Sequence, residues 1–207
     1  DYTINFGGQS LPQHEDGDNG AFKTNCGMTK KFLEPSDANM GTTLACRANV
    51  GTSGPGFEMP LLMSKWALSE RMMDGTNAGF LRDDDALLGV IYLTDENDAS
   101  NDTNNWVIGT TGGEPAPNWN PADQVQFFDA LKGNRTKWAA GVIAGDGNCS
   151  SNFGDAVDAV RLKEFVELAN GNGTTQATFS SICAGDLTIG LQNILNTFQT
   201  ACGNIIL

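Results

Sequence analysis

Histidine and basic residues are scarce in this chain. One histidine, His14, stands among 207 residues, which argues against a His-rich zinc site and leaves little room for a Ser-His-Asp triad. Twelve Lys and Arg residues face 25 Asp and Glu residues, for a formal net charge of -13. We therefore expect neither nucleic acid nor an anionic membrane as a partner, because both need clustered positive charge.

Long apolar runs and CxxC pairs are also lacking. No stretch of about 18 apolar residues occurs, so we expect no membrane span. Residues 1–20 are polar and acidic and do not resemble a signal peptide, so we expect a processed product or a part of a longer chain. The absence of CxxC disfavours zinc ribbons and thioredoxin-like chemistry.

The five cysteines are widely spaced in polar sequence, which is typical of an oxidising, extracytoplasmic setting with two disulfides. Five reduced, buried cysteines are the alternative. We expect Cys26 to pair with Cys46 inside a long loop over 9–56, where the bond contributes about 3 kcal/mol. We pair Cys149, in a strand-end loop, with Cys183, at the end of a short strand, which leaves Cys202 unpaired.

Strand and helix patterns alternate along the chain. The runs at 86–94 and 138–144 are apolar throughout, as in strands buried on both faces of a parallel sheet. We expect shorter strands over 2–6, 179–183 and 204–207, and helices over 60–75, 121–131, 155–168 and 187–200. The pattern predicts one α/β domain over 1–207, with a doubly wound, mostly parallel sheet, helices on both faces and long disulfide-tied loops.

An acidic segment follows the first buried strand. Strand 86–94 stops at Asp95, and ligands of open α/β sheets bind beyond the carboxyl ends of the strands. Ten Asp and Glu residues and no Lys or Arg lie between Asp83 and Asp129. Mg²⁺ and Ca²⁺ prefer oxygen ligands, so we predict one divalent-cation site at Asp95. A solvated acidic loop is the alternative.

The order of these segments resembles bacterial exported von Willebrand factor A-like (vWA) domains. In that family a hydrophobic strand runs into a Thr-Asp dipeptide, as in LGVIYLTDENDAS at 88–100. The likeness covers roughly residues 1–203 and extends to four further stretches: GTSGPGFE at 51–58, FFDALKG at 127–133 with AGVIAG at 140–145, RLKEF at 161–165, and SIC at 181–183 with the final helix.

The resemblance implies a metal-ion-dependent adhesion site. Asp95 matches its third loop, and Thr52 matches its second loop, with Ser53 as the rival in a shifted register. Glu58 is either a helix-start residue or part of the metal shell. Asp98 either shapes the turn or ligates the metal.

The family's first strand, its first helix and its Asp-x-Ser-x-Ser motif have no counterpart here. By this resemblance, segment 2–6 corresponds to the family's second strand. The missing first strand would lie beside strand 86–94. We therefore expect the domain to be incomplete at its N-terminus. Three explanations are open: upstream residues of a longer chain supply the first strand, a second chain supplies it, or this variant lacks the metal site.

We expect an extracellular or cell-surface adhesion module that binds a protein or glycan ligand through Mg²⁺ or Ca²⁺. The alternative is a structural subunit of a surface appendage or assembly, without a working metal. An enzyme is disfavoured, because no nucleophile–base pair or cofactor loop is visible.

Overall fold

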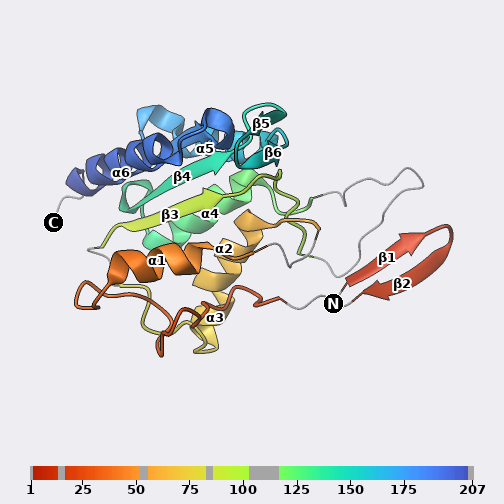
Figure 1. Cartoon of the computed structure of the whole chain (residues 1–207), viewed down its shortest axis with the longest axis horizontal. Coiled ribbons are helices and arrows are strands. Elements are labelled where there is room, and N and C mark those ends of the chain that lie inside the picture. The colour runs from red at the N-terminus through yellow and green to blue at the C-terminus, as the bar shows by residue number, and fades with distance from the viewer. Residues whose placement is uncertain (1, 14–16, 52–55, 83–85, 103–116, 205–207) are drawn as a thin grey trace.

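A computed structural model describes residues 2–13, 17–51, 56–82, 86–102 and 117–204. Its centre is a parallel sheet of β3 (Leu88–Leu93), β4 (Trp138–Ala144) and β7 (Ala177–Ser181), in the order β3-β4-β7 (Figure 1). The parallel α/β core expected from the sequence is therefore confirmed. The complete doubly wound sheet stays a prediction.

One face of this sheet carries most of the core. Three helices cover it: α2 (Pro60–Leu68), α4 (Pro121–Lys132) and α5 (Val160–Ala169). Aromatic side chains fill the space between them, with Phe128 against Trp138 and Tyr92 edge-on to Phe165. α4 starts where it does because Pro121 suits a first turn and Asn120 and Asp123 form a capping box.

The other face is covered by α6 (Leu187–Gly203), which lies over β4 and β7. The helix approaches closely because Gly141 of β4 leaves room for Ile194, and the hydroxyls of Thr178 and Thr197 share a hydrogen bond. A side chain at Gly141 would meet Ile194 atoms at 2.4 Å. The glycine therefore sets the depth at which α6 packs.

We expect Gly141→Ala to lower the free energy of unfolding by about 1–3 kcal/mol, because the added methyl overpacks the contact with Ile194. Ile194→Val in the same chain should restore part of the loss. The control is Gly41→Ala in α1, where a Cβ meets nothing within 4 Å and alanine favours the helix. Urea unfolding measures all three. Equal stabilities for wild type and Gly141→Ala would contradict the close approach.

Several expected elements differ in detail. Strand β1 (Tyr2–Phe6) exists, but it pairs antiparallel with β2 (Gln9–Gln13) in a hairpin and does not join the parallel sheet. The expected long loop contains β2 and also α1 (Met40–Ala48). The expected helix over 60–75 is two helices, α2 and α3 (Glu70–Met73), divided at Ser69.

The helix expected from Asp155 begins five residues later, at Val160. The intervening chain forms a hairpin of β5 (Cys149–Ser151) and β6 (Gly154–Ala156). Of the strand expected over 204–207, Asn204 follows α6 as its C-cap and the rest lies outside the described residues. Single turns of 3-10 helix occupy Arg135–Lys137 (η1), Gly171–Gly173 (η2) and Ile182–Ala184 (η3).

Strand β3 is not buried on both faces. Leu88 and Tyr92 point into the core, but Ile91 and Leu93 are 44% and 52% exposed. Within the described residues β3 pairs with β4 alone, so its second edge has no strand beside it. The described residues therefore cover β3 on one side only, and the prediction of a central strand covered on both sides by a further segment stays a prediction.

Both expected disulfides, Cys26–Cys46 and Cys149–Cys183, are present, and Cys202 is unpaired and exposed. Disulfides of this kind are typical of proteins from oxidising compartments. No helix in the described part of the chain is long and apolar enough to cross a membrane.

Candidate functional site

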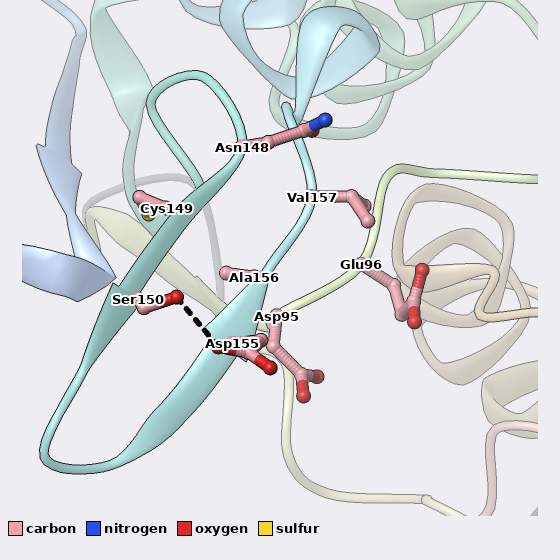
Figure 2. Close-up of a pocket in the computed structure, with 8 residues that line it drawn as sticks. All are labelled: Asp95, Glu96, Asn148, Cys149, Ser150, Asp155, Ala156 and Val157. Atoms are coloured by element: carbon pink, nitrogen blue, oxygen red, sulfur yellow. Dashed lines mark hydrogen bonds between the residues drawn. The ribbon is translucent and has the colours of Figure 1, made fainter.

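A cavity of about 530 Å³ opens at the carboxyl ends of β3 and β4. Its wall combines the turn after β3 with the β5–β6 hairpin, and Figure 2 shows acidic and polar side chains around it. The lining residues are Asp95, Glu96, Asn148, Cys149, Ser150, Asp155, Ala156 and Val157.

Backbone hydrogen bonds hold these segments together. The Val157 N–H donates to the Asp95 carbonyl at 2.9 Å, and the Ala159 N–H donates to the Gly145 carbonyl at 3.0 Å. Gly145 is buried against the Val157 carbonyl, where a Cβ would come within 1.9 Å. The ends of β3 and β4 are therefore fixed relative to the hairpin.

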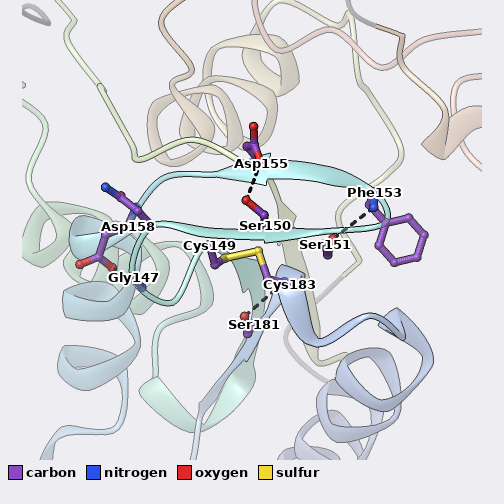
Figure 3. Close-up of a disulfide and its surroundings, with 10 residues drawn as sticks. Gly147, Cys149, Ser150, Ser151, Phe153, Asp155, Asp158, Ser181 and Cys183 are labelled. Carbon is purple, nitrogen blue, oxygen red and sulfur yellow. Dashed lines mark hydrogen bonds between the residues drawn. A yellow bond between two sulfur atoms is a disulfide. The ribbon is translucent and has the colours of Figure 1, made fainter.

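The Cys149–Cys183 disulfide ties the hairpin to η3 at the end of β7 (Figure 3). Across the hairpin, the Ser150 hydroxyl donates to the Asp155 carboxylate at 2.6 Å. The disulfide thus links the hairpin that carries Asp155 to the sheet, and Asp155 faces the same cavity as Asp95 (Figure 2).

The cavity has an acidic character. Three carboxylates, those of Asp95, Glu96 and Asp155, belong to its wall. The nearby Lys163 ammonium binds Asp158 at 2.5 Å, and this bond, together with one from the Gly147 N–H, lowers the pKa of the Asp158 carboxyl. The arrangement suits a cation or a positively charged group of a ligand.

Glu58 lies at the same end of β3. Its carboxylate accepts a hydrogen bond from the Thr94 hydroxyl, and its carbonyl accepts one from the Ala99 N–H at 2.8 Å. The structure therefore brings Glu58 to the residue that precedes Asp95, although 36 positions separate Glu58 from Thr94.

Asp98 has a different environment. It is fully buried, and one carboxylate oxygen accepts from the Leu61 N–H at 3.1 Å and from the Ser100 hydroxyl at 2.6 Å. The other oxygen accepts from the Ser100 N–H and from the Arg161 guanidinium, each at 3.2 Å. Asp98 thus holds the first turn of α2, the turn after β3 and α5 together.

Of the five expected metal residues, the structure places Asp95 at the cavity, Glu58 beside Thr94 and Asp98 in the buried network. Thr52 and Ser53 lie outside the described residues. Among the residues that the structure describes, no group of three or more His, Cys, Asp or Glu side chains could by itself hold a metal ion. The described residues offer oxygen donors of the right chemistry, but not a complete ligand set.

Sequence reasoning missed Asp155 as a site residue. The pattern after Asp155 is amphipathic and therefore predicts a helix that begins at Asp155, whereas the structure places Asp155 in the β5–β6 hairpin. A signal was present in Ser151-Asn-Phe-Gly154, because Asn and Gly between short polar runs favour a tight turn.

Comparison with known proteins found no match: no family model, no curated protein and no solved structure is detectably similar to the chain.

Proposed function

We propose that this protein is a non-enzymatic, extracytoplasmic interaction module of the vWA type. It binds a protein or glycan ligand at the carboxyl ends of its parallel strands, through one Mg²⁺ or Ca²⁺ ion at Asp95. The observation that carries the proposal is the position of Asp95, which lies two residues beyond the end of the parallel strand β3 and lines an acidic cavity with Glu96 and Asp155.

The chemistry of the donors fits a hard cation. Asp95 supplies a carboxylate at the cavity wall, and Glu58 and Thr94 supply further oxygens at the same strand end. Thr52 and Ser53 remain the proposed donors of the second loop. Asp98 is left out of the proposed ligand set, because all its hydrogen bonds go to groups that hold the fold.

A divalent ion with an open coordination position recruits a carboxylate from a partner. In the proposed module, the protein supplies the acidic wall and the bound ion supplies the positive charge that an acidic ligand needs. The two disulfides support the extracellular or cell-surface setting.

We expect the midpoint of thermal unfolding to rise in millimolar Ca²⁺ or Mg²⁺ compared with chelator, since a ligand that binds the folded state stabilises it. At ten times the Kd the gain is about 1.4 kcal/mol. Asp95→Ala should abolish both this shift and the heat of cation binding in calorimetry. Glu167→Gln, an exposed change on α5, is the control and should keep both. Equal melting temperatures in chelator and in either cation would contradict a working site in this chain.

A structural subunit is the second candidate, and the edge of β3 favours it. The edge strand has no proline and no charged residue, which are the usual protections against pairing with another chain. We propose that a strand from outside residues 1–207 adds to this edge, either from an upstream segment or from a second chain.

A further inference from the structure

Four Asn-x-Ser/Thr tripeptides, or sequons, occur in the chain, and the cavity described above does not account for them as a set. In exported proteins this tripeptide is the acceptor of N-linked oligosaccharides. The asparagines are Asn101, Asn134, Asn148 and Asn172. A glycan is large and hydrated and must stay in solvent once the chain has folded, so the fold selects among the four positions.

Asn134 lies in the turn between α4 and β4, directly before η1, and it is exposed. Its side-chain oxygen accepts hydrogen bonds from the Thr136 N–H at 3.0 Å and from the Thr136 hydroxyl at 3.3 Å. Both bonds use the oxygen of the amide, and neither uses the nitrogen. The hydroxyl of the sequon therefore lies against the acceptor asparagine, while the amide nitrogen is not needed for the cap of η1.

We propose that Asn134 carries an N-linked oligosaccharide, added from a lipid-pyrophosphate carrier during export. The nitrogen of the Asn134 amide forms a bond to the anomeric carbon of the oligosaccharide. The bond from that carbon to the pyrophosphate breaks, the lipid pyrophosphate leaves with the electron pair, and one amide proton passes to a base of the transferase. The product keeps its carbonyl oxygen, so the glycosylated asparagine still caps η1 through Thr136.

The sequon at Asn148 has a different geometry. Asn148 lines the cavity at the carboxyl ends of the strands (Figure 2). Its side-chain oxygen accepts from the Asp158 N–H at 3.0 Å, and the Ser150 hydroxyl of this sequon donates to Asp155 and not to the asparagine. A glycan at Asn148 would stand at the cavity itself, where it would obstruct a ligand.

The two remaining sequons also lack the arrangement found at Asn134. Asn101 is half-buried, and its Thr103 lies outside the described residues. In the sequon of Asn172, the Thr174 hydroxyl donates to a backbone carbonyl, that of Gly171 at 3.1 Å or that of Ala169 at 3.4 Å. Among the sequons whose hydroxyl the structure describes, Asn134 alone has the hydroxyl on its own side chain.

The position of Asn134 is compatible with ligand binding. η1 leads directly into Trp138, the first residue of β4, whereas the cavity lies beyond the carboxyl end of the same strand. The seven residues of β4 separate the two ends by about 20 Å at the usual rise of a parallel strand. A glycan at Asn134 therefore leaves the cavity open. The inference goes beyond the proposed ligand binding and shares with it only the extracytoplasmic setting.

Mass spectrometry of the protein isolated from the organism that makes it tests the proposal. Cleavage after Leu131 and Trp138 gives the peptide 132–138. This peptide should carry the mass of an oligosaccharide on Asn134 and should release sugar ions on fragmentation. Thr136→Ser keeps the sequon and should keep the glycan, whereas Thr136→Ala should lose it.

Asn134→Asp is the matched variant. Its carboxylate keeps an acceptor for the Thr136 N–H, but it has no amide nitrogen, so the glycan should be lost from a protein that remains folded by circular dichroism. An unmodified 132–138 peptide in the exported wild-type protein would overturn the proposal. A glycan found only at another sequon, or a modification of 132–138 that persists in Asn134→Asp or Thr136→Ala, would overturn it as well. Cation binding at Asp95 is measured separately by calorimetry, so failure of one proposal is distinguishable from failure of the other.

Discussion

Replacing Asp98 with alanine is expected to lower the free energy of unfolding by about 3–5 kcal/mol, the usual cost of leaving one member of a buried ion pair without its partner. Asp98 is fully buried, and its carboxylate accepts four hydrogen bonds, from Leu61, from Arg161 and two from Ser100. The alanine variant leaves the mostly buried Arg161 guanidinium without its carboxylate. It also removes the acceptor for the first turn of α2.

Urea unfolding measures this effect. Asp98→Asn is the matched variant, because it keeps an acceptor for the Leu61 N–H while it removes the charge that faces Arg161. We expect it to fall between wild type and Asp98→Ala. The stability lost in Asp98→Ala should be the same in chelator and in Ca²⁺ or Mg²⁺. If Asp98→Ala lowered the free energy of unfolding in Ca²⁺ or Mg²⁺ but not in chelator, Asp98 would be a metal ligand.

Removing the Cys149–Cys183 disulfide should cost about 3–4 kcal/mol, because the bond closes a loop with a sequence separation of 34. The Cys149→Ala/Cys183→Ala double variant should also loosen the β5–β6 hairpin, since the disulfide ties that hairpin to the end of β7. Hydrogen exchange should then speed up over 149–156 more than over β4.

The control is the Cys26→Ala/Cys46→Ala variant. It opens a loop of separation 20 and should lose about 3 kcal/mol, without faster exchange over 149–156. Intact mass before and after reduction counts the disulfides, and peptide mapping assigns the pairs. A native protein that is fully reduced would contradict the pairing and the exported setting together.

Asp95 and Asp98 are close in sequence, but their side chains have different roles. They lie three positions apart in one acidic turn. Asp95 is exposed at the cavity wall, whereas Asp98 turns inward to Leu61 and Arg161. The rigid network around Asp98 holds the turn that presents Asp95, so the proposed ligand site depends on an acid that does not contact the ligand.

The sequence by itself determined the parallel α/β core and the disulfides. Strand 138–144 is apolar at every position, and all seven of its residues are buried, as the continuous run predicts. The helix predicted over 121–131 is α4, Pro121–Lys132, because Pro121 suits a first turn and the apolar residues that follow it recur at helical spacing. The Cys26–Cys46 and Cys149–Cys183 pairs followed from where the predicted loops and strand ends lay.

Only the tertiary structure decided which face each residue takes and which residues meet. An apolar run such as 88–93 reads as buried on both faces, yet Ile91 and Leu93 are exposed, because burial depends on a neighbouring element and not on the strand itself. The role of Asp98 could not be predicted either, since its partners Leu61 and Arg161 lie 37 and 63 positions away. The hydrophobic period of a sequence indicates local secondary structure. Ion pairs, cavities and uncovered strand edges depend on how distant segments pack against one another, which is settled only when the chain has folded.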